Sequence, residues 1–211
     1  MKVLFHVKHA EEPRPLIDTA LELGVALSSV QVRGLEAFEA LLLERAVPAG
    51  MVAEADAGRL RRRHVLDCLR AASVVSSQDL DAYDLGSGAG LPGVVVAIAR
   101  PDLRITLVEA RRRRAAFLEL AAQQLHLENV TVAAARLETL IEPVDLCFAR
   151  ALAPLPRAWT LAEPLLRPGG RLVYFAGTET PTLREIDGVG MKEVRNTSVL
   201  ERSGPLVIMT R

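Results

Sequence analysis

A glycine-rich turn that begins with an acidic residue is the part of this sequence with the clearest chemical meaning. Residues 84–93 read Asp-Leu-Gly-Ser-Gly-Ala-Gly-Leu-Pro-Gly, between a short apolar segment and a helix-like run at 94–99. A strand, a glycine turn and a helix in this order bring backbone N–H groups up to a ligand. Glycine suits the turn because it adopts positive φ and because any Cβ would block close approach.

A second acidic residue follows at the distance expected for a nucleoside site. Residues 103–108 read as the next strand, and Glu109 at its end lies nineteen positions beyond Gly90. A carboxylate at about that distance can accept hydrogen bonds from both hydroxyls of a ribose. The turn and the carboxylate together predict a nucleoside-binding crevice. The alternative is that Asp84 and Glu109 are solvated strand ends.

The register of the turn indicates which nucleoside fits. The dinucleotide fingerprint G-x-G-x-x-G is present at residues 88–93, but it should begin directly after an apolar strand. Here the strand ends in Asp84, whose charge would repel a pyrophosphate and attract an ammonium group. S-adenosylmethionine carries an ammonium and a sulfonium but no phosphate, so the pattern favours this methyl donor over a dinucleotide. A glycine turn without a ligand is the third possibility.

Charge and hydrophobicity indicate a well-packed protein. Half of the 211 residues are hydrophobic, and 26 basic residues balance 26 acidic ones. A disordered chain and a protein that coats nucleic acid nonspecifically are therefore not expected. A nucleic-acid substrate would need local basic patches, and the arginine-rich segments 59–63 and 111–114 are the two candidates. On a helix the second segment points in several directions, so a solvated surface is its default interpretation.

Cysteine usage and hydropathy indicate a cytoplasmic protein. Cys68 and Cys147 lie far apart in the sequence, on an expected helix and an expected strand. This placement predicts two buried, reduced thiols, which are typical of the cytosol. The apolar patch near the N-terminus is too short for a signal peptide, and no run approaches the length of a membrane span. We find no metal-ligand cluster in the sequence and expect no metal.

The expected elements fall into a helical part and an alternating part. Apolar residues at helical spacing predict a cap at residues 1–79 with helices at 13–24, 32–47 and 57–75. Residues 80–211 form one compact unit in which strands and helices alternate, which predicts a mostly parallel sheet covered on both faces. Its expected strands are 82–85, 104–108, 129–133, 144–149 and 170–175, and its expected helices are 92–99, 111–125, 155–166 and 182–186.

The C-terminal residues depart from this alternation. Two strand-like runs, 192–200 and 205–209, are joined by a turn at 202–204. An antiparallel hairpin that closes an α/β sheet is the methyltransferase variant of the doubly wound fold, whereas a dehydrogenase would continue with parallel units. The predicted fold is therefore α/β: a Rossmann-like sheet of the class I S-adenosylmethionine-dependent methyltransferases, with an antiparallel C-terminal hairpin and an N-terminal helical extension.

Motifs outside the turn strengthen this interpretation. They are Arg63-His64-Val65-Leu66-Asp67-Cys68, the Leu91-Pro92-Gly93 ending, Glu109-Ala110 with Arg113-Arg114 and Phe117-Leu118, Glu128-Asn129-Val130, Arg136 with Glu138, and Ala149-Arg150-Ala151. With them, the chain from about Leu16 to Gly177 resembles the bacterial small-subunit ribosomal RNA guanine-N7 methyltransferases, also called glucose-inhibited division protein B. Two segments depart from the family pattern: 48–52 replaces a usual Asn-Leu-Thr, and Ala176-Gly177 replaces Lys-Gly.

The resemblance implies a cofactor, a partner and a set of site residues. The cofactor is S-adenosylmethionine, and the partner is the 16S ribosomal RNA of the small ribosomal subunit; we expect no membrane association and a monomer. The implied donor-binding residues are Asp84, Gly86, Ser87, Gly88, Gly90, Leu91, Glu109, Ala110, Ala135, Arg136, Leu137, Glu138 and Arg150. The implied substrate-binding residues are Arg63, His64, Arg113 and Arg150, of which Arg150 and His64 are also the candidate catalytic residues.

The implied chemistry makes modest demands on the site. Guanine N7 has a free lone pair and no proton to lose, so alignment with the sulfonium methyl supplies most of the catalysis. A hydroxyl or carbon acceptor would need a nearby base, and the sequence presents no evident acid/base dyad. Two other functions stay open: a donor- or RNA-binding homologue without turnover, and a small-molecule methyltransferase, which the neutral net charge favours.

Three candidate residues also have structural interpretations. Arg136 follows the third strand, where its loop should pass the adenine, but it could equally be a surface arginine. Arg150 ends the fourth strand and faces the crevice at the carboxyl ends of the strands. We favour an RNA contact for it over an internal salt bridge. His64 contacts substrate or donor in one interpretation and bonds a backbone carbonyl in the other.

Overall fold

The computed structural model describes residues 15–177, 190–194, 200 and 203–211. The predicted helix at 182–186 lies outside these residues. So do most of the predicted strand at 192–200 and the first residue of the turn at 202–204. All structural statements below concern the described residues.

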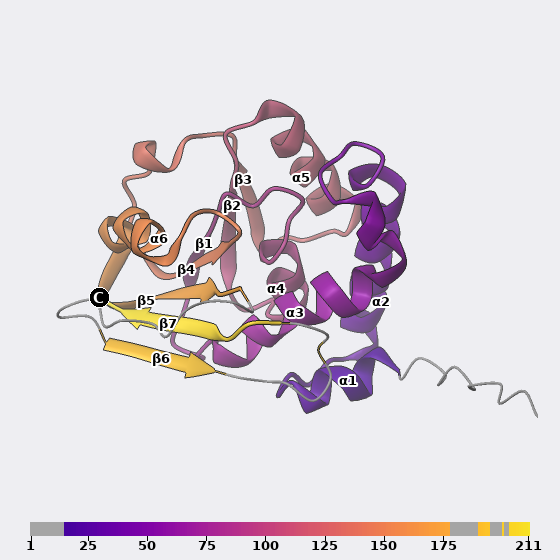
Figure 1. Ribbon diagram of the computed structural model, residues 1–211, viewed down its shortest axis with the longest axis horizontal. Helices are drawn as coiled ribbons and strands as arrows, with labels where there is room; N and C mark the ends of the chain where they lie inside the picture. The colour runs from indigo at the N-terminus through magenta and orange to yellow at the C-terminus, as the bar shows by residue number, and fades with distance from the viewer. Residues whose placement is uncertain (1–14, 178–189, 195–199, 201–202) are drawn as a thin grey trace, which may run out of the picture.

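One sheet of seven strands organises the described part of the chain (Figure 1). Its order is β3-β2-β1-β4-β5-β7-β6, with β1–β5 parallel and β7 antiparallel to both β5 and β6. The strands are β1 (Asp81–Leu85), β2 (Arg104–Val108), β3 (Val130–Ala133), β4 (Val144–Arg150), β5 (Leu166–Phe175), β6 (Gly190–Val194) and β7 (Leu206–Thr210). The chain order reverses between β1 and β4, and ligands of such sheets bind at that point, beyond the carboxyl ends of the strands.

Helices lie on both sides of the sheet. They are α1 (Leu16–Glu22), α2 (Ser29–Leu41), α3 (Leu66–Leu69), α4 (Gly93–Ala99), α5 (Arg112–Gln124) and α6 (Leu155–Ala162). Figure 1 shows α6 on one side of the sheet and the N-terminal helices on the other. Short 3-10 or π turns complete the helical segments, at Leu42–Ala46, Glu54–Arg59, Arg61–Val65, Arg70–Val74, Leu137–Thr139 and Glu163–Leu165.

The strands alternate between two apolar cores, as strands covered on both faces must. Ile105 and Leu107 pack in the core shared with the N-terminal helices, α4 and α5. Val108 and Cys147 pack in the second core, under α6 and its Trp159. The prediction of a doubly covered sheet closed by an antiparallel hairpin is therefore confirmed.

The N-terminal helices share the core of the sheet. Helix α2 begins with a capping box, in which Ser28 and Gln31 exchange backbone and side-chain hydrogen bonds. The Gln31 side chain also donates to the Ala99 carbonyl at 2.9 Å, which fastens α2 to the end of α4. Phe38 of α2 is fully buried in the core that contains β-strand side chains. The boundary at residue 79 stays a prediction, but the apolar core crosses it.

Two predicted elements need correction. The helix predicted at 57–75 is a succession of a 3-10 turn, a π turn, the short α3 and a second 3-10 turn. Strand β5 begins at Leu166, four residues before the strand predicted at 170–175, so Pro168 and Gly169 lie inside the strand. Gly169 accommodates the resulting irregularity with φ +80°, next to a register shift against β4 between Val144 and Leu146.

Because the core crosses residue 79, the cap and the sheet should unfold together. We expect Phe38→Ala to lower the free energy of unfolding by about 3–5 kcal/mol. Denaturant titration followed by circular dichroism and by fluorescence of Trp159, the single tryptophan, should show one shifted transition. Val30→Ala is the control, because Val30 on the same helix is 66% exposed. If the unfolding transition followed by Trp159 fluorescence is the same in Phe38→Ala as in the unmodified protein, the helices and the sheet do not share one core.

Candidate functional site

The glycine turn lies between β1 and α4, at the point where the strand order reverses. Gly86, Gly88 and Gly90 have φ values of +72°, +59° and +82°, a region that other residues avoid. The Ser87 N–H donates to the Val108 carbonyl at 3.0 Å, which fastens the turn to the end of β2. The turn is therefore held by backbone bonds while its glycines leave the backbone open to a ligand.

Asp84 is buried at the base of this turn. Its side chain is 1% exposed, and its Oδ2 accepts a hydrogen bond from the Gly93 N–H at 2.9 Å. Burial raises the pKa of this carboxyl to about 6, against hydrogen bonds and the positive charge of Arg150, which lower it. A Cβ on Gly93 would lie 2.5 Å from the same Oδ2. Asp84 thus positions the first residue of α4.

Glu109 braces the turn from the neighbouring strand. It is 6% exposed; its Oε2 accepts from the Gly88 N–H at 3.2 Å and its Oε1 from the Arg111 N–H at 2.8 Å. The Arg114 guanidinium approaches Oε2 at 3.9 Å. Each carboxylate oxygen keeps further acceptor capacity. With Asp84 and Glu109 both buried, the interpretation of these acids as solvated strand ends is wrong.

The loop after β3 lies beside Glu109, as its place in the sheet requires. The Glu109 N–H donates to the Ala133 carbonyl at 3.0 Å. Residues 135–138 follow, with Leu137 half-buried in the second core and Arg136 exposed. Within the described residues the Arg136 side chain makes no hydrogen bond or ion pair, so the structure gives it the position of a surface arginine next to the crevice.

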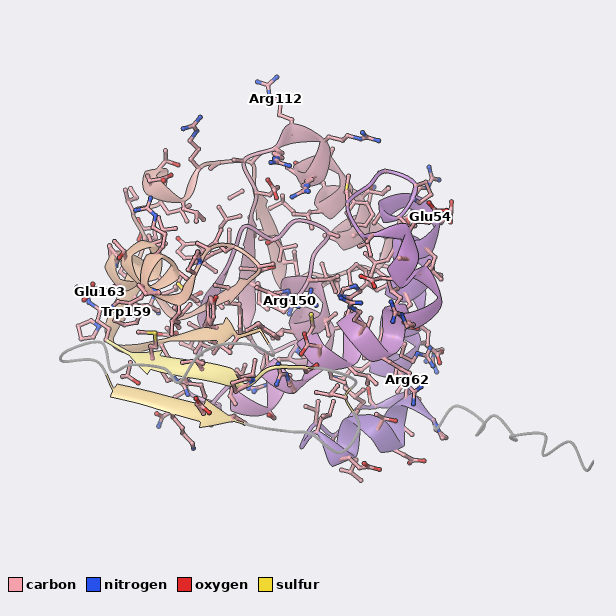
Figure 2. All side chains as sticks on the ribbon, in the orientation of Figure 1. Glu54, Arg62, Arg112, Arg150, Trp159 and Glu163 are labelled. Carbon is pink, nitrogen blue, oxygen red and sulfur yellow. The ribbon has the colours of Figure 1, made fainter. Side chains whose placement is uncertain are left out.

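Arg150 has an internal partner. Its Nε donates to Asp67 Oδ2 at 3.2 Å, and its Nη2 lies 2.8 Å from His64 Nδ1. The side chain is only 19% exposed. Figure 2 shows Arg150 between the sheet and the N-terminal helices. The sequence favoured a contact to RNA over an internal salt bridge. The internal salt bridge is present, and the contact to RNA stays a prediction.

His64 joins Arg150 to a residue that sequence reasoning missed. Its Nε2 lies 3.0 Å from Asp56 Oδ2, so it bonds side chains rather than the backbone carbonyl considered as an alternative. Burial lowers the pKa of His64, and the charge of Arg150 lowers it further. Asp56 is 8% exposed. The only sequence signal was an acidic residue eight positions before the histidine, at the start of the helical segment.

The remaining basic candidates lie on the surface. Arg63 is 52% exposed and pairs with Asp56 Oδ1 at 3.0 Å. Arg111, Arg112 and Arg113 are exposed, whereas Arg114 turns toward Glu109. Figure 2 shows Arg112 pointing away from the molecule, far from Arg62. The structure therefore brings His64 and Arg150 together, whereas no hydrogen bond or ion pair within the described residues joins the exposed Arg113 to them.

One family model matches most of the chain. A family model described as rRNA small subunit methyltransferase G (GidB) matches residues 31–188. The chain belongs to this family. The matched range contains the glycine turn, Glu109, His64 and Arg150, so the resemblance drawn from those motifs is confirmed. No helix within the described ranges is long and apolar enough to cross a membrane.

Relatives of this family cover most of the chain. Proteins named ribosomal RNA small subunit methyltransferase G from Acidiphilium cryptum and Acidothermus cellulolyticus are each 42% identical, over 76% and 69% of this chain. The one from Nocardioides sp. is 46% identical over 68% of the chain. The matches span 75%, 64% and 58% of these three relatives, respectively.

Solved structures confirm the predicted fold. The O-methyltransferase TomG from Streptomyces achromogenes has a TM-score of 0.58 at 18% identity, over 88% of this chain and 91% of that one. A methyltransferase from Geobacter sulfurreducens has a TM-score of 0.56 at 16% identity, over 85% and 88%. A SAM-dependent methyltransferase from Aquifex aeolicus has 0.54 at 15% identity, over 77% and 97%.

The contact between Asp84 and Gly93 yields a direct prediction. We expect Gly93→Ala to lower the free energy of unfolding by about 1–3 kcal/mol, because the new methyl would overlap Asp84 and Leu107. Chemical denaturation measures the change. Gly58→Ala is the matched control, since a Cβ on Gly58 meets nothing within 4 Å. Equal stability of the two variants would mean that the turn is not packed as described.

Proposed function

We propose that the protein transfers the methyl group of S-adenosylmethionine to N7 of a guanine in 16S ribosomal RNA. Its membership of the rRNA small subunit methyltransferase G family is the observation that carries the proposal. The name of its relatives supplies the substrate class, a ribosomal RNA of the small subunit. The crevice at the end of β1 supports the choice of donor.

The residues at this crevice fit the donor. Asp84 offers a negative charge at the end of β1 to the ammonium group, and Glu109 offers acceptors at the end of β2 to the ribose hydroxyls. Glycines with positive φ at 86, 88 and 90 let the ligand lie against the backbone. In this proposal Ser87, Leu91 and Ala110 line the turn, and residues 135–138 lie against the adenine.

The protein's part in the reaction is alignment. When bound, the donor supplies an electrophilic methyl on its sulfonium, and the N7 lone pair of guanine attacks it with loss of the neutral thioether. The base has no proton to remove, so the side chains have to orient and exclude water rather than act as a base. Arg150, whose charge reaches Asp84, is the residue best placed to contact the donor or the target base.

A second candidate is a homologue that binds donor or RNA without turnover. The family's usual lysine after β5 is replaced by Ala176, which is buried in the second core with its N–H bonded to the Pro205 carbonyl. This position offers no cation to a substrate. A small-molecule methyltransferase is the third candidate, on the ground of the neutral net charge.

One labelling experiment separates these candidates. The protein is incubated with S-adenosylmethionine labelled in the methyl group and with small ribosomal subunits from a strain that lacks the modification. We expect label in the RNA, at N7 of guanine after nuclease digestion. Donor binding without transfer would favour the second candidate. Label only in small metabolites of a cell extract would favour the third.

Donor affinity should follow the ionisation of Asp84. Because its pKa lies near 6, the carboxyl is ionised at neutral pH and protonated below about pH 6. We expect affinity for S-adenosylmethionine to fall below about pH 6 and Asp84→Asn to bind about tenfold to a hundredfold more weakly, without this pH dependence. Calorimetric titration measures both effects.

Two further variants complete this test. Glu109→Gln should weaken donor binding by a similar factor, because a charged acceptor is replaced by a neutral one. Asp102→Asn is the control, since Asp102 is an exposed partner of Arg100 far from the turn. If Asp84→Asn and Glu109→Gln both bind like the unmodified protein, the crevice is not the donor site.

A further inference from the structure

A line of polar contacts runs from the N-terminal helical segment to the end of β4. Asp56 contacts His64, His64 contacts Arg150, and Arg150 contacts Asp67 of α3. The two acids are each 8% exposed, so the line is largely removed from water. Such an arrangement is strong only if each donor meets an acceptor.

The direction of each hydrogen bond follows from the chemistry of arginine. A guanidinium only donates, so His64 Nδ1, 2.8 Å from Arg150 Nη2, must be the acceptor. The ring proton of the neutral imidazole is therefore on Nε2, which donates to Asp56 Oδ2 at 3.0 Å. Asp56 thus selects the tautomer that can hold Arg150.

The two contacts fix the guanidinium and leave one nitrogen over. Arg150 uses Nε toward Asp67 and Nη2 toward His64, and within the described residues its Nη1 has no hydrogen bond. A long arginine side chain loses much rotamer freedom when it binds a ligand. The contacts to Asp67 and His64, here called the clamp, restrict Arg150 before any ligand binds, so binding costs less conformational entropy. Arg150 is therefore prepared to donate through Nη1.

The clamped arginine belongs to the crevice side of the sheet. Asp84 pairs in register with Phe148 of β4, and Arg150 lies two residues beyond Phe148. Residues two apart in a strand share a face, so Arg150 and Asp84 lie on one face at the carboxyl ends of neighbouring strands. The effect of the Arg150 charge on the pKa of Asp84 agrees with this placement.

We propose that His64, oriented by Asp56, is a positioning residue that holds the Arg150 guanidinium at the methyl-donor crevice. The proposal rests on the proposed function for the reaction that Arg150 serves, but the clamp itself is a property of the protein alone. It replaces the direct substrate contact that the sequence suggested for His64, and it gives Asp56 a role.

The clamp should open in acid. The charged groups around His64 are Asp56 and Arg63 from its own helical segment and Arg150 from β4, with Asp67 of α3 behind Arg150. Protonation of Nδ1 would remove the acceptor and set two cations against each other. Since the pKa of His64 is below its usual value, the clamp is intact above about pH 6.5 and is lost as pH falls through the lowered pKa.

Single-turnover methylation with saturating donor tests the role of His64. His64→Leu removes the acceptor and should slow transfer about tenfold, the effect of one charged hydrogen bond. His64→Gln can accept from Arg150 and donate to Asp56, so it should restore most of the rate and lose the acid-side decline. In an Arg150→Ala background, His64→Leu should not lower the transfer rate any further, because the partner of His64 is already absent.

A neighbouring ion pair supplies the control for this experiment. Glu39→Gln disturbs the Arg61–Glu39 pair, which joins α2 to the same helical segment at 2.7–2.9 Å, and should leave the transfer rate unchanged. The proposal is overturned if His64→Leu keeps the full rate, if His64→Gln is as slow as His64→Leu with the same pH profile, or if the losses at His64 and Arg150 simply add.

Nitrogen-15 NMR tests the clamp without any activity. The free protein should show His64 as the Nε2–H tautomer, with slow rotation of the Arg150 guanidinium that His64→Leu accelerates and His64→Gln preserves. An Nδ1–H tautomer, or rotation indifferent to His64→Leu, would overturn the clamp. If the NMR results hold but no RNA is labelled, the proposed function fails and the clamp stands.

Discussion

A buried carboxylate at the end of β1 is the interaction on which the site depends. Asp84 accepts from the first N–H of α4 and lies against Gly93, whose missing side chain lets α4 approach Asp84 and Leu107 of β2. Burying this charge is costly, as its pKa near 6 indicates. The cost is tolerated because a backbone N–H and the nearby charge of Arg150 stabilise the ionised form. The same group therefore sets the geometry of the turn and the electrostatics of the crevice.

The N-terminal helices take part in this electrostatic balance. Arg150 reaches the crevice from β4, but its partners His64 and Asp67 come from the helical segment that packs across the sheet. Asp67 is also within 2.8 Å of the buried Arg70, whose Nη1 donates to the Gly204 carbonyl near β7. Removing one partner would leave a charge buried without compensation, which is costly. The helices thus act as part of the site rather than as a separate cover.

Sequence reasoning succeeded where the constraint is local and failed where it is distant. The glycines and Asp84 follow from turn chemistry within ten residues, and the parallel strands follow from their apolar runs. The partners of Arg150 lie 83 and 86 positions away, and no spacing rule connects residues so far apart. The regular helix expected at 57–75 failed for a related reason. Periodicity detected its apolar face, but side chains of this segment also bond distant residues, as Arg61 does with Glu39 and His64 with Arg150, and periodicity contains no signal for such bonds.

The proposed reaction explains why the charged guanidinium of Arg150 is held in one orientation by its neighbours. Transfer to a nitrogen lone pair has no proton step that a tuned acid or base could accelerate, so the gain has to come from orientation. Orientation is lost through side-chain freedom, and arginine has more of it than most residues. A guanidinium held by Asp67 on one side and by a neutral histidine on the other keeps its charge and loses its freedom. A histidine suits that place better than a second carboxylate, because it accepts the hydrogen bond without neutralising the charge that stabilises Asp84.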